Sequence, residues 1–276
     1  MANFHLPPSG FGPGSQADEN GDLDWMPLPS GMRTYGMHLP EIEDSAPLAP
    51  ALMLLRDVAR ACRTVADGGP LQGFDLGGLD TANRALIAET LGQGEVSVRA
   101  RGVPAIAMQE SVFAGVWVLK AEGLDRIEVA PIPEHAITRA FRPQRPAIGA
   151  LTPRNDAVIN APPILAELMD KSAAWTSRAD LHVVNLTLLP HTEEDLVWLD
   201  QALGEGSVTI LSRGYGNCRV TATGQDRVWR VQFFNSMDTL ILDTFEVTDI
   251  PEVTLAAPED LADSAERLVE VLEAIR

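Results

Sequence analysis

The sequence predicts an α+β protein built from two tandem, related modules, each a helix, a strand and a second helix followed by an antiparallel strand meander. The first observation behind this prediction is an internal repeat: the segments 74–134 and 184–252 carry the same landmarks in the same order. The second is a Gly- and Pro-rich N-terminal stretch, which indicates an extended arm. The third is a helical pattern at the C-terminal end.

The repeat is defined by phrases rather than by single residues. Because several landmarks keep their register over about sixty residues, duplication is a better explanation than chance. Superposing the two copies should therefore place Trp117 on Trp229 and Leu91 on Leu203. The shared landmarks are FDL and VNL, LGQGEVSVRARG and LGEGSVTILSRG, the pairs Val116-Trp117 and Val228-Trp229, and the Ile-Pro-Glu endings at 132–134 and 250–252.

Residues 1–44 form the predicted arm, because their Gly and Pro content opposes both helix and regular strand. Apolar residues such as Phe4, Phe11 and Trp25 are too frequent for a purely solvated linker. We therefore expect part of the arm to pack across the body in extended form.

The first module is predicted at residues 45–140 and the second, with a C-terminal helix, at 163–276. Each opens with a helix-start signal at proline, and apolar residues follow at helical spacing. Between them, residues 141–162 are Pro-rich and lack apolar periodicity, which is typical of a linker. In each module the LGxG phrase indicates a helix end at glycine followed by a half-buried antiparallel strand.

The helix predicted from Pro258 to Arg276 is amphipathic. Leu261, Ala265, Leu268, Leu272 and Ile275 form its apolar stripe, and its other face carries Asp263, Glu266, Glu270 and Glu273. A helix docked on the protein surface is the first interpretation. A helix offered to a partner is the alternative.

Charge and cysteine content exclude some functions. The chain has 21 Lys+Arg against 39 Asp+Glu, a formal net charge of −18, so nucleic acid would be repelled, whereas a cationic partner would be attracted. Solubility alone also explains such an acidic balance. Two isolated cysteines indicate a reducing compartment. The first residues resemble no export signal and no stretch reaches membrane-spanning length, so we expect a cytoplasmic protein without membrane insertion.

Local sequence offers no catalytic, cofactor-binding or metal-binding residues. The two glycine phrases follow a helix instead of preceding one, where the helix dipole disfavours phosphate. The five histidines lack short metal-ligand spacing, and no nucleophile motif is found. The sequence therefore predicts neither an enzyme nor a cofactor carrier.

The residues that stand out have structural as well as functional interpretations. Trp117 and Trp229 are expected to anchor the module cores, with a position at a partner interface as the alternative. Arg213, like Arg101, precedes a glycine; a structural ion pair is the first interpretation and a recognition contact the second. Glu110, together with Glu128 and Glu246, is expected at a solvated strand position.

Several phrases resemble one known family. LGQGEVSVR, QESVFAGVW, RGYG, TATGQDRVW and IPEVTLAAPEDLADSAERL are similar to the HupH/HyaF-type hydrogenase expression and formation proteins, and the resemblance extends to FHLPP and GPGS near the N-terminus. It implies a non-enzymatic chaperone in nickel-iron uptake hydrogenase maturation. The implied partners are the iron-sulfur small-subunit precursor, before twin-arginine export, and a thioredoxin-like accessory protein.

Two alternatives remain open. One is a carrier of an iron-sulfur cluster or metal, which would need ligands assembled in space from Cys62, Cys218 and histidines. The other is an enzyme with a site between the two modules. For the chaperone, the candidate partner-binding residues are Phe4, Phe11, Trp25, Glu110, Trp117, Arg213, Trp229, Asp263, Glu266, Glu270 and Glu273.

Overall fold

The computed structural model describes residues 15–17, 23–25, 46–213 and 217–275. The chain divides into two units, Met1–His38 and Leu39–Arg276. In the first unit, β1 (Ser15–Ala17) pairs with β2 (Leu23–Trp25) in an antiparallel sheet. Trp25 ends β2, whereas Phe4 and Phe11 lie outside the described residues. The predicted packing of the arm also falls outside them.

The second unit contains the predicted order of elements twice. The first half is α1 (Ala49–Ala66), β3 (Gln72–Asp75), α2 (Thr81–Leu91), β4 (Val96–Ala100), β5 (Ile106–Glu110), β6 (Val116–Ala121), β7 (Leu124–Val129) and the short α3 (Glu134–Thr138). The second half is α4 (Ala161–Ala174), β8 (His182–Asn185), α5 (Glu193–Leu203), β9 (Val208–Ser212), β10 (Asn217–Ala222), β11 (Val228–Phe234), β12 (Leu240–Val247) and α6 (Pro258–Ala274). Helices thus combine with an antiparallel sheet, as an α+β fold requires.

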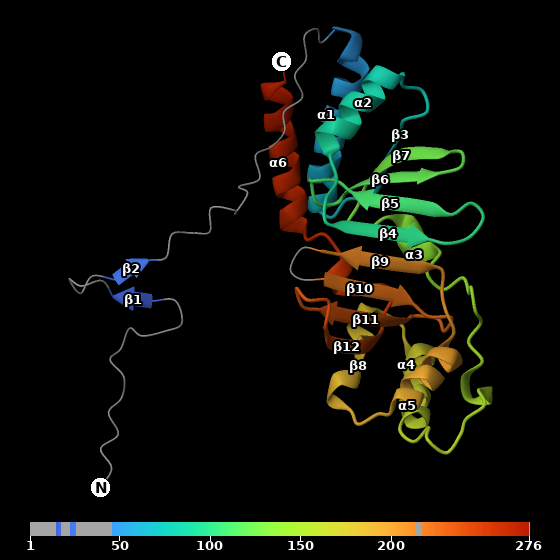
Figure 1. Cartoon of the computed structure of the whole chain (residues 1–276). Helices are drawn as coiled ribbons and strands as arrows, with labels where there is room; N and C mark the ends of the chain where they lie inside the picture. Colours follow the sequence, from blue (N-terminus) through green and yellow to red (C-terminus); the bar gives the residue numbers. More distant parts are fainter. Residues whose placement is uncertain (1–14, 18–22, 26–45, 214–216, 276) are drawn as a thin grey trace. The chain divides into compact units, whose positions relative to one another are not determined.

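All strands of the two halves join one ten-stranded sheet, in the order β3-β7-β6-β5-β4-β9-β10-β11-β12-β8 (Figure 1). Read from each outer edge toward the centre, the two halves have the same strand order. The halves meet where β4 pairs antiparallel with β9, with Ala100 opposite Val208. The sequence did not predict this joint, which makes the two halves one body.

The LGxG phrases have one structural role in both halves. Leu91 and Leu203 are the last residues of α2 and α5, and the glycines that follow them have φ values of 55° and 68°. The second glycine of each phrase lies against backbone: a Cβ on Gly94 would be 2.1 Å from the Ser111 oxygen, and one on Gly206 2.4 Å from the Ala140 oxygen. The first glycine therefore ends the helix, and the second permits close backbone contact.

Gly206→Ala is therefore expected to lower the free energy of unfolding by on the order of 1–3 kcal/mol, because the added methyl group overpacks a site that backbone encloses. Gly78→Ala is the matched control, since a Cβ there would meet nothing within 4 Å. Urea unfolding of both variants measures the difference. Equal stability of the two variants would contradict this role for Gly206.

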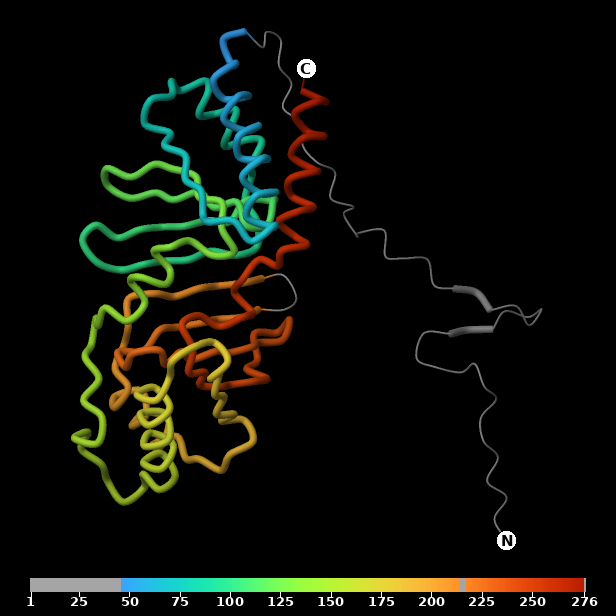
Figure 2. Tube along the Cα trace, turned by 180° about the vertical axis from the view of Figure 1, so that it is seen from behind, coloured from blue at the N-terminus to red at the C-terminus, as the bar shows by residue number. Residues whose placement is uncertain are grey.

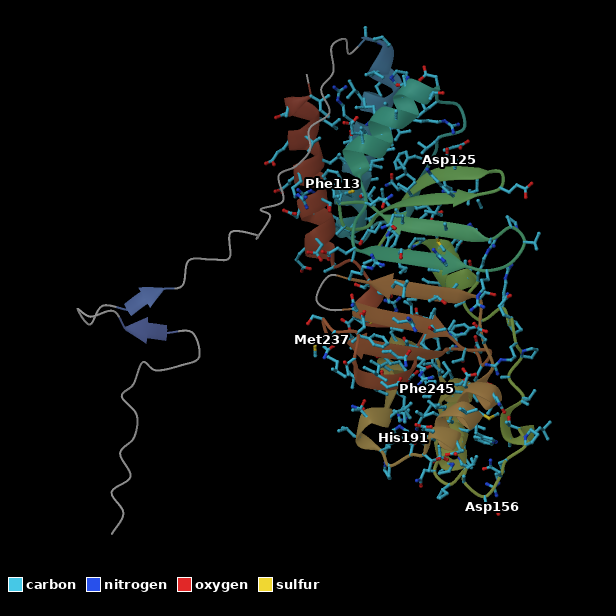
Figure 3. The ribbon with its side chains drawn as sticks, in the orientation of Figure 1. Phe113, Asp125, Asp156, His191, Met237 and Phe245 are labelled. Carbon is cyan, nitrogen blue, oxygen red and sulfur yellow. The ribbon has the colours of Figure 1, made fainter. Side chains whose placement is uncertain are left out.

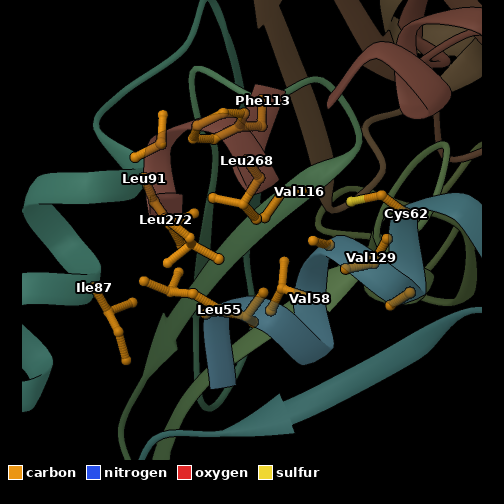
Figure 4. Close-up of a cluster of buried hydrophobic side chains, with 14 of the residues drawn as sticks. Leu55, Val58, Cys62, Ile87, Leu91, Phe113, Val116, Val129, Leu268 and Leu272 are labelled. Carbon is orange, nitrogen blue, oxygen red and sulfur yellow. The ribbon is translucent and has the colours of Figure 1, made fainter. Parts of the chain in front are cut away.

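One face of the sheet is covered by helices at its two ends. In the first half, α1, α2 and α6 pack on it, and Figure 4 shows Leu55, Val116 and Leu268 in this core. In the second half, α4 and α5 pack against Val228 and Phe245. The opposite face carries a third cluster that continues across the joint between β4 and β9.

The C-terminal helix was predicted with nearly its observed bounds, and its apolar stripe from Leu261 to Ile275 is buried. Although α6 follows the second half in sequence, it packs against α1 in the core of the first half (Figure 1). Its position is therefore fixed by long-range contacts that the helical pattern alone does not reveal.

The segment between α3 and α4 runs beside the second half (Figure 2). The end of this segment is held by Asp195, which is fully buried. One oxygen of its carboxylate accepts the backbone N–H groups of Ile159, Asn160 and Ala161, and the other accepts the N–H of Thr192. Burial acts to raise the pKa of Asp195, but these donors outweigh it and the pKa is lowered. The Asp195 carboxylate thereby caps the N-terminal ends of both α4 and α5. The module boundaries at residues 44, 140 and 162 stay predictions.

Candidate partner-binding site

A groove of about 700 Å³ lies between α1 and α6. Ala59 of α1 and Ala265, Val269 and Leu272 of α6 give it apolar surface, and Val269 is 45% exposed. The side chains along its walls are charged. We call this feature the α1–α6 groove. It combines apolar surface with charged walls, as a site for a protein segment requires.

One wall carries most of the acidic face predicted from the sequence: Glu266, Glu270 and Glu273 line the groove, whereas Asp263 does not. Asp263, Glu266, Glu270 and Glu273 are all exposed. Asp263 lies 3.6 Å from Arg267 on the same helix, and Glu266 accepts a hydrogen bond of 2.7 Å from Arg63. Within the described part of the chain, Glu270 and Glu273 form no ion pair.

Glu270 and Glu273 also lie near the C-terminal end of α6, where the helix dipole is negative and no basic side chain occupies the last turn. Negative charge at this end of a helix is unfavourable for stability. These two carboxylates make no ion pair with a described residue, and they remain available to a cationic ligand.

The other wall is basic, and the sequence reasoning missed it. Arg56, Arg60 and Arg63 line the groove from α1. Arg60 pairs with Asp57 on its own helix, and Arg63 pairs with Glu266 across the groove. The spacing of the three arginines on α1 could have shown that they share a helix face. The acidic character expected of the whole α6 face is thus confined to Glu270 and Glu273.

Trp117 and Trp229 lie in the cluster on the opposite face of the sheet, and both are 0% exposed. Their burial in the core is confirmed, and in this conformation neither ring is accessible to a partner. The Trp117 ring N–H donates to the Ala130 oxygen at 3.1 Å. Trp229 contacts Phe141 edge-on, with 5.2 Å between the ring centroids.

The solvation predicted for three glutamates was wrong for Glu110 and Glu128, which are 8% and 1% exposed, whereas Glu246 is half-buried. Their side chains share the face of Trp117 and Trp229: Glu110 and Glu128 flank Trp117 on neighbouring strands, and Glu246 is opposite Trp229. That face is buried, and alternation along a strand does not reveal which of its two faces is covered.

Glu110 is accordingly an internal group. Its carboxylate accepts the Gly115 N–H at 3.0 Å. Burial raises its pKa to about 7; the Gly115 hydrogen bond acts in the opposite direction, and the charges of Asp260 and Glu95 act with burial. A partner could not contact Glu110 unless the chain opened around it.

Arg213 is exposed where β9 ends, and its backbone N–H donates to the Glu95 oxygen at 3.2 Å. Arg101, which precedes the corresponding glycine, forms an ion pair with Glu205 of the second half. The ion-pair interpretation is therefore confirmed for Arg101. Arg213 stays a proposed contact.

Cys62 and Cys218 are buried in different clusters, and burial raises the pKa of their thiols to about 12 and about 11. The charge of Glu246 adds to the effect at Cys218. Among the described residues, no three His, Cys, Asp or Glu side chains are grouped so that they could hold a metal ion. None of the described helices has the length and apolar character needed to cross a membrane.

Comparison with known proteins identifies relatives along the whole chain. The chain is 62% identical over 276 residues to the hydrogenase expression/formation protein HupH of Rhodobacter capsulatus, with 100% of both chains covered. It is 45% identical to HoxQ of Cupriavidus necator, covering 99% of this chain and 98% of HoxQ. With the hydrogenase-1 operon protein HyaF of Escherichia coli it shares 32% identity, covering 98% of this chain and 95% of HyaF.

A solved structure of the hydrogenase expression protein HupH from Thiobacillus denitrificans is 26% identical, covers 42% of this chain and 96% of its own, and gives a TM-score of 0.40. The family model for the HupH hydrogenase expression protein, C-terminal conserved region, matches residues 48–141 and 158–275, which correspond to the two halves of the fold. The chain therefore belongs to the HupH hydrogenase expression protein family.

Proposed function

We propose that this protein is an accessory factor of hydrogenase maturation that acts as a non-enzymatic assembly chaperone. The names of its relatives, which are hydrogenase expression/formation proteins, support the role in maturation. The proposed client is the iron-sulfur small-subunit precursor, bound in the cytoplasm before twin-arginine export. A thioredoxin-like accessory protein is a further proposed partner.

The observation that carries this proposal is the α1–α6 groove. A twin-arginine leader is basic at one end and apolar along its length. Glu270 and Glu273, which pair with no described residue, offer negative charge for the basic end, while Val269 and Leu272 offer apolar surface nearby. Charge would accelerate the encounter, and apolar contact would slow dissociation.

The two alternatives receive less support. A cluster carrier that used both cysteines as ligands would need them close together, but Cys62 and Cys218 lie in separate clusters. An enzyme acting between the halves would need converging ionisable groups at the joint. There, the side chains of Val98 and Ile210 are buried on one face, and Ser97, Arg99 and Thr209 lie on the other.

We also propose that the two halves arose by duplication. Their identical strand order supports this, as do the matching places of Trp117 and Trp229, each the second residue of its strand. Both tryptophans are opposite a glutamate on the next strand. The C-terminal helix α6 packs in the core of the first half among the described residues, so the α1–α6 groove belongs to that half.

The test is the rate at which the protein associates with the purified small-subunit precursor. Glu270→Lys with Glu273→Lys is expected to lower the association rate about three- to tenfold at low salt, because attraction of the leader becomes repulsion. Raising the salt concentration should slow association of the wild-type protein, since exposed charges are screened beyond about 10 Å at 0.1 M. Dissociation should change less.

The matched control is Asp156→Lys with Asp170→Lys, which changes the net charge equally. Both residues are exposed, Asp156 in the segment before α4 and Asp170 on α4, and Figure 3 labels Asp156 far from α6. An equal reduction in both variants would assign the effect to total charge and exclude the α1–α6 groove. Equally tight binding of a precursor without its leader would exclude the leader as the main determinant.

A further inference from the structure

Among the described residues, the helix-covered face of the sheet is open in the middle. No described helix lies in front of β5, β4, β9 and β10 in Figure 1, although α1, α2 and α6 cover one end of this face and α4 and α5 the other. On these four strands the side chains alternate between the buried cluster and the open face. The open side chains, all exposed or half-exposed, are Ser97, Arg99, Ala107, Gln109, Thr209, Leu211, Arg219 and Thr221.

The ends of α2 and α5 border this open face. Beside α2 a cavity of about 540 Å³ is lined by Gly92 from the helix end and by Arg99 and Lys120 from the sheet. Beside α5 a smaller cavity of about 170 Å³ is lined by Gly204 and Arg219. We call the open face and its two bordering cavities the central trough.

The central trough is positively charged on a protein of net charge −18. Each acidic side chain that lines its cavities is paired with an arginine: Asp125 with Arg84, Asp200 with Arg145, and Glu205 with Arg101. By contrast, Arg99, Lys120 and Arg219 form no ion pair with any described residue. The trough therefore has a net positive charge, carried by Arg99, Lys120 and Arg219.

The strand register places these cations on one surface. Lys120, Ala107 and Arg99 lie side by side on β6, β5 and β4, so Lys120 and Arg99 are about 10 Å apart at the backbone. Arg219 is two strands beyond β4 in the neighbouring row, where its guanidinium lies 5.5 Å from the centre of the Phe234 ring. Asp125 and Phe245, labelled in Figure 3, lie in the row that contains Arg99, on β7 and β12 respectively.

The dimensions suit one helix. Four strands span about 14 Å between the outer two, and an α-helix with its side chains is about 10–12 Å across. Between the cations the surface consists of small side chains, Ala107, Thr209 and Thr221, which would permit close approach. A helix laid there would extend the layer already formed by α2 and α5.

We propose that the central trough binds an acidic α-helix of a partner protein, whose carboxylates accept hydrogen bonds from Arg99, Lys120 and Arg219. The overall charge of the chain would repel such a helix, so local attraction at the trough must provide its specificity. This surface is separate from the α1–α6 groove. It favours an acidic ligand, whereas the groove is proposed to bind a basic one. The proposal therefore does not depend on leader binding.

The probe is an alanine-based helical peptide with glutamates along one face and a photo-crosslinker at its centre. Its affinity for the full chain, measured by fluorescence anisotropy, should exceed that of the same peptide with glutamine in place of glutamate. Arg99→Gln with Lys120→Gln should weaken binding of the acidic peptide about tenfold, since two charge-assisted contacts are lost. Crosslinks should map to β4, β5, β9 or β10.

Arg154→Gln with Lys171→Gln is the matched control, because these exposed cations lie outside the trough and their removal changes the net charge equally. This variant should bind the acidic peptide like the wild-type chain. The proposal is overturned by equal loss of affinity in both variants, by equal affinity for the glutamine peptide, or by crosslinks at α1 and α6. Equal binding of an acidic peptide whose helix is broken by proline would overturn the helical ligand.

Discussion

Trp117→Ala and Trp229→Ala are each expected to lower the free energy of unfolding by about 3 to 5 kcal/mol, measured by chemical denaturation. Both rings are 0% exposed in the cluster that continues across the joint of the two halves. Removing either ring leaves a large cavity on one face of the sheet, whose strands cannot move independently to fill it. The cost therefore includes lost packing as well as lost burial.

Replacement by phenylalanine should affect stability differently at the two tryptophan positions. Trp117→Phe removes the hydrogen bond to the Ala130 oxygen and leaves that buried acceptor without a donor. The lost hydrogen bond alone should lower the free energy of unfolding by about 1–3 kcal/mol. The Trp229 ring N–H has no hydrogen-bond partner among the described residues, so Trp229→Phe should cost less. Unchanged stability combined with lost partner binding would instead show that the tryptophan is an interface contact.

Local chemistry explains why so much of the element order could be predicted. The LGxG phrases predict where α2 and α5 end, because the position after the helix has a positive φ, a conformation that favours glycine. The stripe from Leu261 to Ile275 predicted α6 because helical periodicity is a property of a single segment. Each of these signals lies within about twenty residues of sequence, so no tertiary contact had to be known.

Pairing over long distances could not be predicted in the same way. The β4–β9 joint depends on which strand edges remain free after each half folds, and neither Ala100 nor Val208 indicates its partner. The position of α6 on α1 has the same origin. For this reason the α1–α6 groove was missed, although Glu270 and Glu273 on one of its walls had been singled out.

Strand alternation gives two sets of side chains but not which set is covered. Charge suggested that Glu110 and Glu128 face water, whereas the tryptophan between them, Trp117, belongs to the buried cluster. The cross-strand register, which the sequence does not contain, places all three on one face. On the open face the same register brings Arg99 and Lys120 together and forms the central trough.

The burial of Glu110 leads to a pH-dependent stability. Its pKa is about 7 in the folded state and 4.5 ordinarily, so between these values the folded protein holds a proton that the unfolded chain releases. The free energy of unfolding should therefore fall as pH rises from about 4.5 to 7. A shift of this size corresponds to about 3 kcal/mol of stability, which is fully present below about pH 4.5 and fully lost above about pH 7.

Glu110→Gln isolates this contribution, because the amide oxygen can still accept the Gly115 N–H but the side chain does not ionise. Subtracting the wild-type stability from that of Glu110→Gln at each pH removes the effect of the remaining acidic groups. This difference should grow from about pH 4.5 to 7 and then level off. A difference that is constant with pH would show that Glu110 does not titrate in this range.

Ionisation of Glu110 should also affect the stability of the first turns of α6. Gly115, which Glu110 holds, lies so close to Leu261 that a Cβ on Gly115 would be 2.3 Å from that side chain, and Asp260 adds negative charge near the Glu110 carboxylate. Above pH 7 the ionised Glu110 carboxylate repels Asp260 in the first turn of α6, and hydrogen exchange in the first turns of α6 should become faster in the wild type than in Glu110→Gln. Since α6 forms one wall of the α1–α6 groove, equal exchange in both proteins would separate the titration of Glu110 from the groove.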